Sequence, residues 1–62
     1  MKERFADVPG WTFDIEEVSA NVYEVIGVDT AGHRVEAKGT DPEQLLADAR
    51  TNAKRILEAS RR

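Results

Sequence analysis

The side chains with the clearest capacity for chemistry in this sequence are an aspartate and the lone histidine. Asp29 and His33 flank the segment Thr30-Ala31-Gly32, and a turn there would place them opposite each other. An Asp–His pair is a common element of acid–base sites, but a catalytic site also needs a nucleophile and a cleft. No nucleophile accompanies the pair. We therefore expect a solvated turn, no catalytic residue and a protein that is not an enzyme.

Three carboxylates could be imagined as metal ligands. Asp14, Glu16 and Glu24 are expected on one face of a sheet, where their oxygens could bridge a divalent cation. An open sheet surface is a poor cage, and Lys38 is expected opposite Glu24, where it relieves repulsion. With a single histidine and no cysteine, the chain also lacks the ligands of a structural zinc site. We expect neither a metal nor another cofactor.

Phosphate binding is disfavoured as well. The chain has no glycine-rich run before a helix, and the expected helix begins beside Asp41 and Glu43, whose negative charge opposes an anion.

Length and composition limit the chain to one small domain. It has 62 residues, of which 40% are hydrophobic and 34% charged, with a net charge of −3. We expect an N-terminal arm over residues 1–10 and a single domain over residues 11–62. The lack of a signal-like or membrane-length apolar run, together with the lack of cysteine, favours a cytoplasmic protein outside the membrane.

Apolar and polar residues alternate in three segments, residues 11–15, 22–28 and 34–38, which predicts three strands. Ser19-Ala20-Asn21 is typical of a three-residue hairpin loop, and residues 29–32 are typical of a type I turn with glycine in the left-handed position. The sequence therefore predicts a three-stranded antiparallel meander.

The two loops also predict a common register. The expected pairs are Ile15 with Val25, Phe13 with Gly27, Val25 with Ala37, and Gly27 with Val35. One face of the sheet then forms a core made of Trp11, Phe13, Ile15, Tyr23, Val25, Val35 and Ala37.

A helix is expected after the third strand. Asp41 can cap it, Pro42 suits its first turn, and Gln44 can close a capping box. At helical spacing one stripe is apolar or small, and it contains Leu45, Leu46, Ala49, Ala53, Ile56 and Leu57. The predicted fold is α+β, a βββα arrangement with one C-terminal amphipathic helix packed on one face of the sheet.

Apolar residues also gather on the opposite, outer face of this sheet. The expected members are Val18, Val22, Ile26 and Val28. Either the N-terminal arm covers them with Phe5 and Val8, or another chain does, because apolar residues gathered on a bare surface typically mark an interface. The sequence leaves both alternatives open.

A basic cluster ends the chain and gives a second functional hypothesis. It consists of Arg50, Lys54, Arg55, Arg61 and Arg62. Such a cluster can bind nucleic acid, but it can equally complement the negative end of the helix dipole.

Across residues 22–57, the order of hairpin, Gly39-Thr40-Asp41 and amphipathic helix resembles the N-terminal domain of HicB-type antitoxins. The resemblance implies a partial double-stranded-RNA-binding-domain fold.

The leading hypothesis from the sequence is a protein–protein interaction module that uses its outer sheet face or an edge strand, with a homodimer among the alternatives. Nucleic-acid binding by the basic cluster is the second hypothesis.

Overall fold

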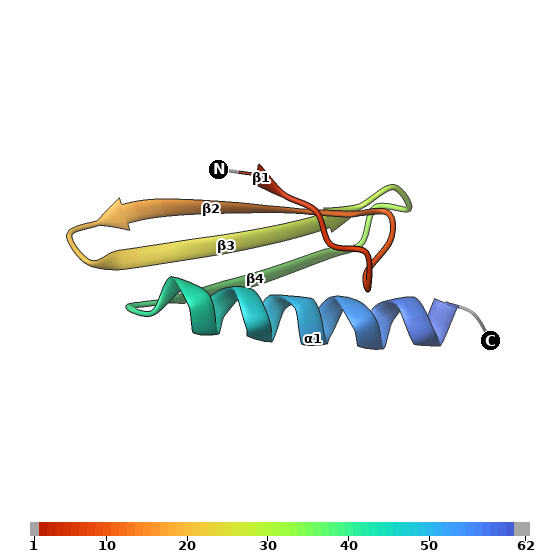
Figure 1. Cartoon of the computed structure of the whole chain (residues 1–62). Coiled ribbons are helices and arrows are strands. Elements are labelled where there is room, and N and C mark those ends of the chain that lie inside the picture. The colour runs from red at the N-terminus through yellow and green to blue at the C-terminus, as the bar shows by residue number, and fades with distance from the viewer. Residues whose placement is uncertain (1, 61–62) are drawn as a thin grey trace.

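The computed structural model describes residues 2–60 as a four-stranded antiparallel sheet packed on one helix (Figure 1). The strands lie in the order β1-β2-β3-β4. Their bounds are Lys2–Glu3 for β1, Trp11–Ser19 for β2, Val22–Asp29 for β3 and Arg34–Gly39 for β4, and α1 spans Pro42–Ser60. The α+β class, the antiparallel sheet and the C-terminal helix agree with the prediction from the sequence. The strand number does not, because β1 adds a fourth strand to the expected meander.

The predicted register is confirmed at all four pairs. Ile15 pairs with Val25 and Phe13 with Gly27 in the first hairpin, while Val25 pairs with Ala37 and Gly27 with Val35 in the second. The connection between β2 and β3 differs in detail from the expected three-residue loop. It contains only Ala20 and Asn21, and a β-bulge between Glu17 and Ser19 supplies the extra residue. Asn21 adopts a positive φ of 59°, as expected of the last loop residue.

The core lies between the sheet and α1. Phe13 is fully buried and its ring lies over Gly27, where an added Cβ would come within 2.6 Å of the ring. The centre of the helix contributes small side chains, Ala49 and Ala53, so that the helix can approach the sheet closely. Ile15, Tyr23 and Ala37 are partly buried and pack against this core, as the sequence predicts.

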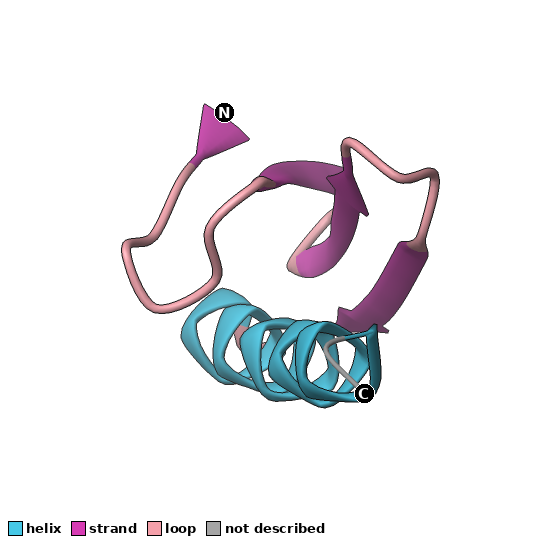
Figure 2. Cartoon of the chain, turned by 90° about the vertical axis from the view of Figure 1, so that its right-hand side faces the viewer, coloured by secondary structure: helices cyan, strands magenta, loops and turns pink. Residues whose placement is uncertain are grey.

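The N-terminal arm belongs to the same packed unit. After β1 it leaves the sheet, approaches α1 and returns to β2, closing that side of the layer between sheet and helix (Figure 2). Val8 is fully buried in the core, and the Phe5 ring lies 5.7 Å from that of Phe13. Of the two alternatives for the outer face, cover by Phe5 and Val8 is therefore wrong, because both side chains pack on the helix side.

Candidate functional site

The outer face of the sheet is built around the central strand β3. Because side chains alternate along a strand, Val25 and Gly27 face the helix, and Val22, Ile26 and Val28 face away from it. Val28 is 44% exposed, and Val22 and Ile26 are partly exposed. The structure thus places three of the four predicted apolar residues on the outer face, where Ile26 and Val28 are neighbours and Glu24 separates them from Val22.

Val18 is the fourth predicted residue, and its placement is different. It is 44% exposed, but it lies inside the bulge of β2. A bulge interrupts the alternation from which its outer position was inferred. We therefore define the outer face by Val22, Ile26 and Val28 and leave Val18 out.

Charged residues surround this apolar centre in rows that cross the strands. Along the outer face, the successive rows of paired residues are Thr12–Val28–Arg34, then Asp14–Ile26–Glu36, then Glu16–Glu24–Lys38, and Val22 lies beyond the last of them. β1 extends the middle row, because Lys2 pairs with Asp14. The Arg34 side chain donates hydrogen bonds to Glu36 within β4.

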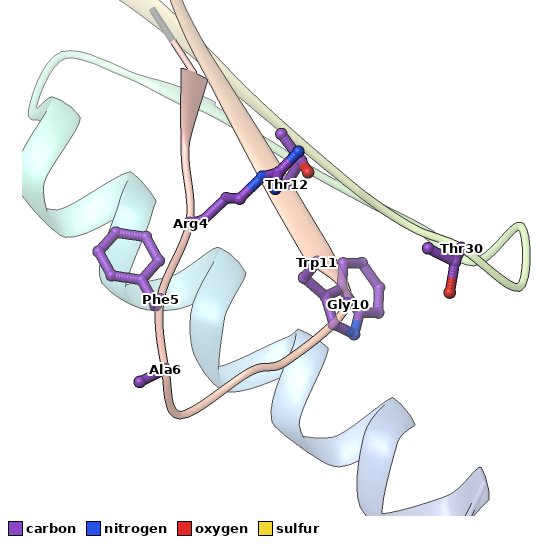
Figure 3. Close-up of a pocket in the computed structure, with 7 residues that line it drawn as sticks. All are labelled: Arg4, Phe5, Ala6, Gly10, Trp11, Thr12 and Thr30. Carbon is purple, nitrogen blue, oxygen red and sulfur yellow. The ribbon is translucent and has the colours of Figure 1, made fainter.

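The arm supplies one further cation to the outer face. Arg4 and Lys2 line a shallow hollow of about 430 Å³ together with Thr12, Ile26 and Val28 of the sheet, and Asp14 completes the lining. In Figure 3 the Arg4 side chain extends toward Thr12, while Phe5 points to the other side of the arm. Sequence reasoning missed Lys2 and Arg4 because it did not predict that the arm pairs with the sheet.

A second hollow, of about 400 Å³, lies between the arm and the start of β2 (Figure 3). Its lining includes one cation, Arg4, and the hydroxyl-bearing residues Thr12 and Thr30, together with Phe5, Ala6, Gly10 and Trp11. The lining has no carboxylate, histidine or cysteine that could act as a base or strong nucleophile.

Asp29 and His33 form the predicted pair, and their geometry is that of a turn cap. The His33 Nδ1 atom lies 2.6 Å from Asp29 Oδ2, and Asp29 Oδ1 accepts hydrogen bonds from the backbone N–H groups of Ala31 and His33. Burial raises the pKa of Asp29, but the hydrogen bonds and the charge of His33 outweigh this effect and leave the pKa below 3.8. The ionised carboxylate therefore holds the turn between β3 and β4.

The acidic residues considered as metal ligands are spread across the sheet. Glu16 pairs with Glu24, and Glu24 pairs with Lys38 on its other side. Asp14 lies in the next row, opposite Ile26. Within residues 2–60, no group of three or more histidine, cysteine, aspartate or glutamate side chains is arranged to hold a metal ion.

The basic cluster is partly used inside the molecule. Arg50 Nη2 and Lys54 Nζ each lie 2.8 Å from Asp7 Oδ2, and the Arg50 guanidinium lies 4.1 Å from the centre of the Phe5 ring. These contacts fix the arm to α1 through two ion pairs and a cation–π contact. Arg55 is exposed, and the predicted residues Arg61 and Arg62 lie outside the described residues.

The contacts of Asp7 predict a pH dependence of stability. Hydrogen bonds from Lys54 and Arg50 hold the pKa of Asp7 below 3.8. A carboxylate whose folded-state pKa is lowered stabilises the fold above its unfolded pKa, and that contribution is lost as the pH falls through the folded pKa. Urea unfolding followed at neutral pH and below pH 3.8 should show a steeper loss of stability in the wild type than in Asp7→Asn. If the wild type and Asp7→Asn lose the same free energy of unfolding between the two pH values, these ion pairs do not contribute to the stability of the fold.

Comparison with known proteins gives no relative: no family model, curated protein or solved structure matches the chain. Over the described residues, no helix is both long and apolar enough to cross a membrane.

Proposed function

We propose that this protein is a non-enzymatic interaction module that binds another protein chain through the outer face of its sheet. The observation that supports this proposal is the course of the N-terminal arm, which packs Phe5 and Val8 against the helix side and leaves Val28 44% exposed. Within residues 2–60, Val22 and Ile26 thus stay partly exposed and Val28 exposed, with the charged residues Lys2 and Arg4 as the arm's contribution to this face. A reducing compartment such as the cytoplasm is the proposed location, since the chain has no cysteine.

The domain is small, and its helix lies on one side of the sheet only. One helix covers only one face of the sheet, and antiparallel sheets with one solvated face normally carry polar residues there. Here the central strand places Val22, Ile26 and Val28 on that face instead. A core of this size stabilises a domain by only a few kcal/mol, so that burial against a second chain adds a large fraction of the total.

The edge strand β4 offers another route for the same function. It has a neighbour on one side only, β3, so its outer backbone groups can pair with an added strand. The charged outer-face residues of β4 are Arg34, Glu36 and Lys38, and such residues commonly protect an edge. We therefore favour the face over the edge.

Ile26→Lys is the substitution that tests the outer face. Ile26 lies between Asp14 and Glu36 in the register, so a lysine there meets two carboxylates and the folded monomer should tolerate it. Desolvation of that charge should instead weaken association by about tenfold or more. Sedimentation over a range of protein concentrations measures self-association, and pull-down from the source cell measures capture of another partner.

Asn52→Lys is the matched control, because Asn52 is an exposed residue on α1 and the substitution adds the same charge away from the outer face. It should leave association unchanged. Circular dichroism establishes that both variants are folded. A folded Ile26→Lys variant that associates as well as Asn52→Lys would remove the outer face from the proposal.

Nucleic-acid binding remains the second candidate, and the HicB-like order of elements does not by itself favour it. Asp7 neutralises part of the basic cluster through Arg50 and Lys54, which weakens this candidate. Heparin retention that falls steeply with salt, without concentration-dependent mass, would favour it over protein binding.

A further inference from the structure

We propose that a hollow on the helix side of the sheet binds an extended segment of another protein, in which a large apolar side chain is flanked by arginine or lysine on the same face. The hollow has a volume of about 430 Å³ and lies between the sheet and the start of α1. Its lining comes from β1, β2, β3 and α1. The hollow is separate from the outer face, so this inference does not depend on the proposed function.

The pairing of the strands determines the sheet side of the hollow. Glu3 of β1 pairs with Phe13, so its side chain lies on the same face as that buried ring, and Ile15 follows Phe13 by two residues on β2. Glu17 continues this face of β2 and pairs with Tyr23 of β3. The sheet therefore presents both carboxylates and apolar side chains to the space beside the helix.

The N-terminal arm leaves the hollow open. The arm is fixed to α1 by the ion pairs of Asp7 with Arg50 and Lys54, well beyond the start of the helix. In Figure 1 the start of α1 lies at the same end of the molecule as the hairpin between β2 and β3, and the arm turns toward the helix further along. Ile15 and Leu46 accordingly stay partly exposed at the edge of the core.

The apolar part of the lining can bury a side chain of a partner. It consists of Ile15, Leu46, Pro42 and the ring of Tyr23, all of them partly exposed. Covering apolar surface contributes about 25 cal/mol per Å². A large aliphatic side chain suits this surface, and a ring such as that of Tyr23 also attracts a guanidinium group.

All charged residues in the lining are carboxylates, namely Glu3, Glu17 and Glu43. Within residues 2–60 none of the three forms an ion pair, although Asp7 does elsewhere on the molecule. Glu17 accepts a hydrogen bond from the backbone N–H of Asn21, which leaves its charge without a cation. The hollow is therefore negative, and it attracts cations.

The two features together select the partner. The negative charge opposes an acidic segment and the phosphates of a nucleic acid. Arginine and lysine suit the hollow, because their aliphatic stems cover apolar surface while their charged ends reach the carboxylates. In an extended chain alternate residues share a face, so arginines placed two positions before and after a leucine point in the same direction as the leucine. Such a segment matches both the apolar surface and the carboxylates.

The probe for this site is a pentapeptide of arginine, serine, leucine, serine and arginine, blocked at both ends. Isothermal titration calorimetry at low salt measures its affinity, and shifts of the backbone amide signals locate it. Replacing its leucine by glycine should weaken binding by about tenfold, because an aliphatic side chain is no longer buried. Replacing both arginines by glutamate should abolish measurable binding. The largest amide shifts should occur at Ile15, Tyr23 and Leu46.

Glu43→Lys and Glu58→Lys form a matched pair of variants. Both positions are exposed on α1, and both substitutions change the net charge equally, but Glu58 lies near the other end of the helix. Glu43→Lys should weaken binding of the arginine peptide by about tenfold, since it brings like charges together. Glu58→Lys should change the affinity by less than about twofold, because exposed charges separated by more than a Debye length are screened. Circular dichroism shows that both variants are folded.

Several results would overturn the proposal. One is a wild type that does not bind the arginine peptide, and another is binding that does not depend on the leucine. Equal weakening by Glu43→Lys and Glu58→Lys would show that net charge alone attracts the peptide. Amide shifts centred on Ile26 would place the peptide on the outer face. Self-association of the wild type that Glu43→Lys abolishes would identify the basic cluster of a second copy as the occupant.

The supporting result is binding that needs both the leucine and Glu43, with amide shifts at the hollow. That result stands whether or not Ile26→Lys affects capture at the outer face, so the two proposals can fail separately.

Discussion

Phe13→Ala should destabilise the domain by about 3 to 5 kcal/mol, the range observed when a large aromatic is truncated in a core. Phe13 is fully buried, and the centre of its ring lies 6.1 Å from that of Trp11 and 5.7 Å from that of Phe5. Truncation therefore removes contacts with the arm, with β2 and with the region over Gly27 at once. Because a domain of this size is stable by only a few kcal/mol, the variant should be largely unfolded at room temperature. Urea unfolding followed by circular dichroism measures the effect.

Phe5→Ala is the comparison for this substitution. Phe5 is only partly buried and contacts the core from its edge, so its truncation should cost less than that of Phe13 and leave the sheet and helix folded. A Phe13→Ala variant as stable as Phe5→Ala would contradict the central position of Phe13 in the core.

The meander and its register could be predicted from the sequence because two local signals agree. Each turn fixes the pairing of its own hairpin, and both hairpins place Val25 and Gly27 on the same face as Phe13 and Val35. The helix was predictable from its cap as well. Asp41 Oδ1 accepts hydrogen bonds from the backbone N–H groups of Glu43 and Gln44, as an N-cap residue does.

The fourth strand could not be predicted, because β1 has only two residues and shows no alternation. Its place is determined by tertiary contacts, since Val8 enters the core and Asp7 binds two cations of α1 that lie more than forty residues later in the chain. The bulge at Val18 could not be predicted either. The same register can be reached by a longer loop or by a shorter loop with a bulge, and sequence pattern does not distinguish them.

The candidate site was predicted in part. Strand alternation alone places Val22, Ile26 and Val28 on the outer face, because it depends only on the register. The charge at the Arg4 end could not be inferred, since it depends on how the arm pairs with β2. The basic cluster could be found in the sequence, but its contacts within the molecule could not. A run of cations is visible in the sequence, but its partner Asp7 is found only when the chain is folded.

Gly27→Ala should destabilise the domain by about 1 to 3 kcal/mol, the range typical of an overpacked core. A Cβ at this position would lie 2.6 Å from Phe13 Cε1, 2.7 Å from Phe13 Cδ1 and 2.9 Å from Val35 Cγ2. Alanine has an opposing benefit, since it restricts the unfolded chain and thereby stabilises a protein by about 0.4 to 1 kcal/mol where the site is unstrained. Here the steric cost should exceed that benefit, because the Phe13 ring is fully buried and packs against the rings of Phe5 and Trp11. Urea unfolding of Gly27→Ala and of the wild type gives the net effect.

Making the same substitution in Phe13→Leu chains shows whether the Phe13 ring causes the loss of stability. In Phe13→Leu chains the two closest ring atoms are replaced by a smaller, flexible side chain, so adding Gly27→Ala should cost much less there than in the wild type, a coupling of about 1 kcal/mol or more. Gly39→Ala is the control within the same sheet, because the three atoms nearest to its added Cβ all belong to the Leu45 side chain, the closest being Cδ2 at 3.3 Å, and that side chain can shift slightly. If Gly27→Ala lowers the free energy of unfolding by the same amount in the wild type and in Phe13→Leu chains, the Phe13 ring is not the cause of the lost stability. If it costs less in the Phe13→Leu background, glycine at position 27 is required because the aromatic ring occupies the volume of its side chain.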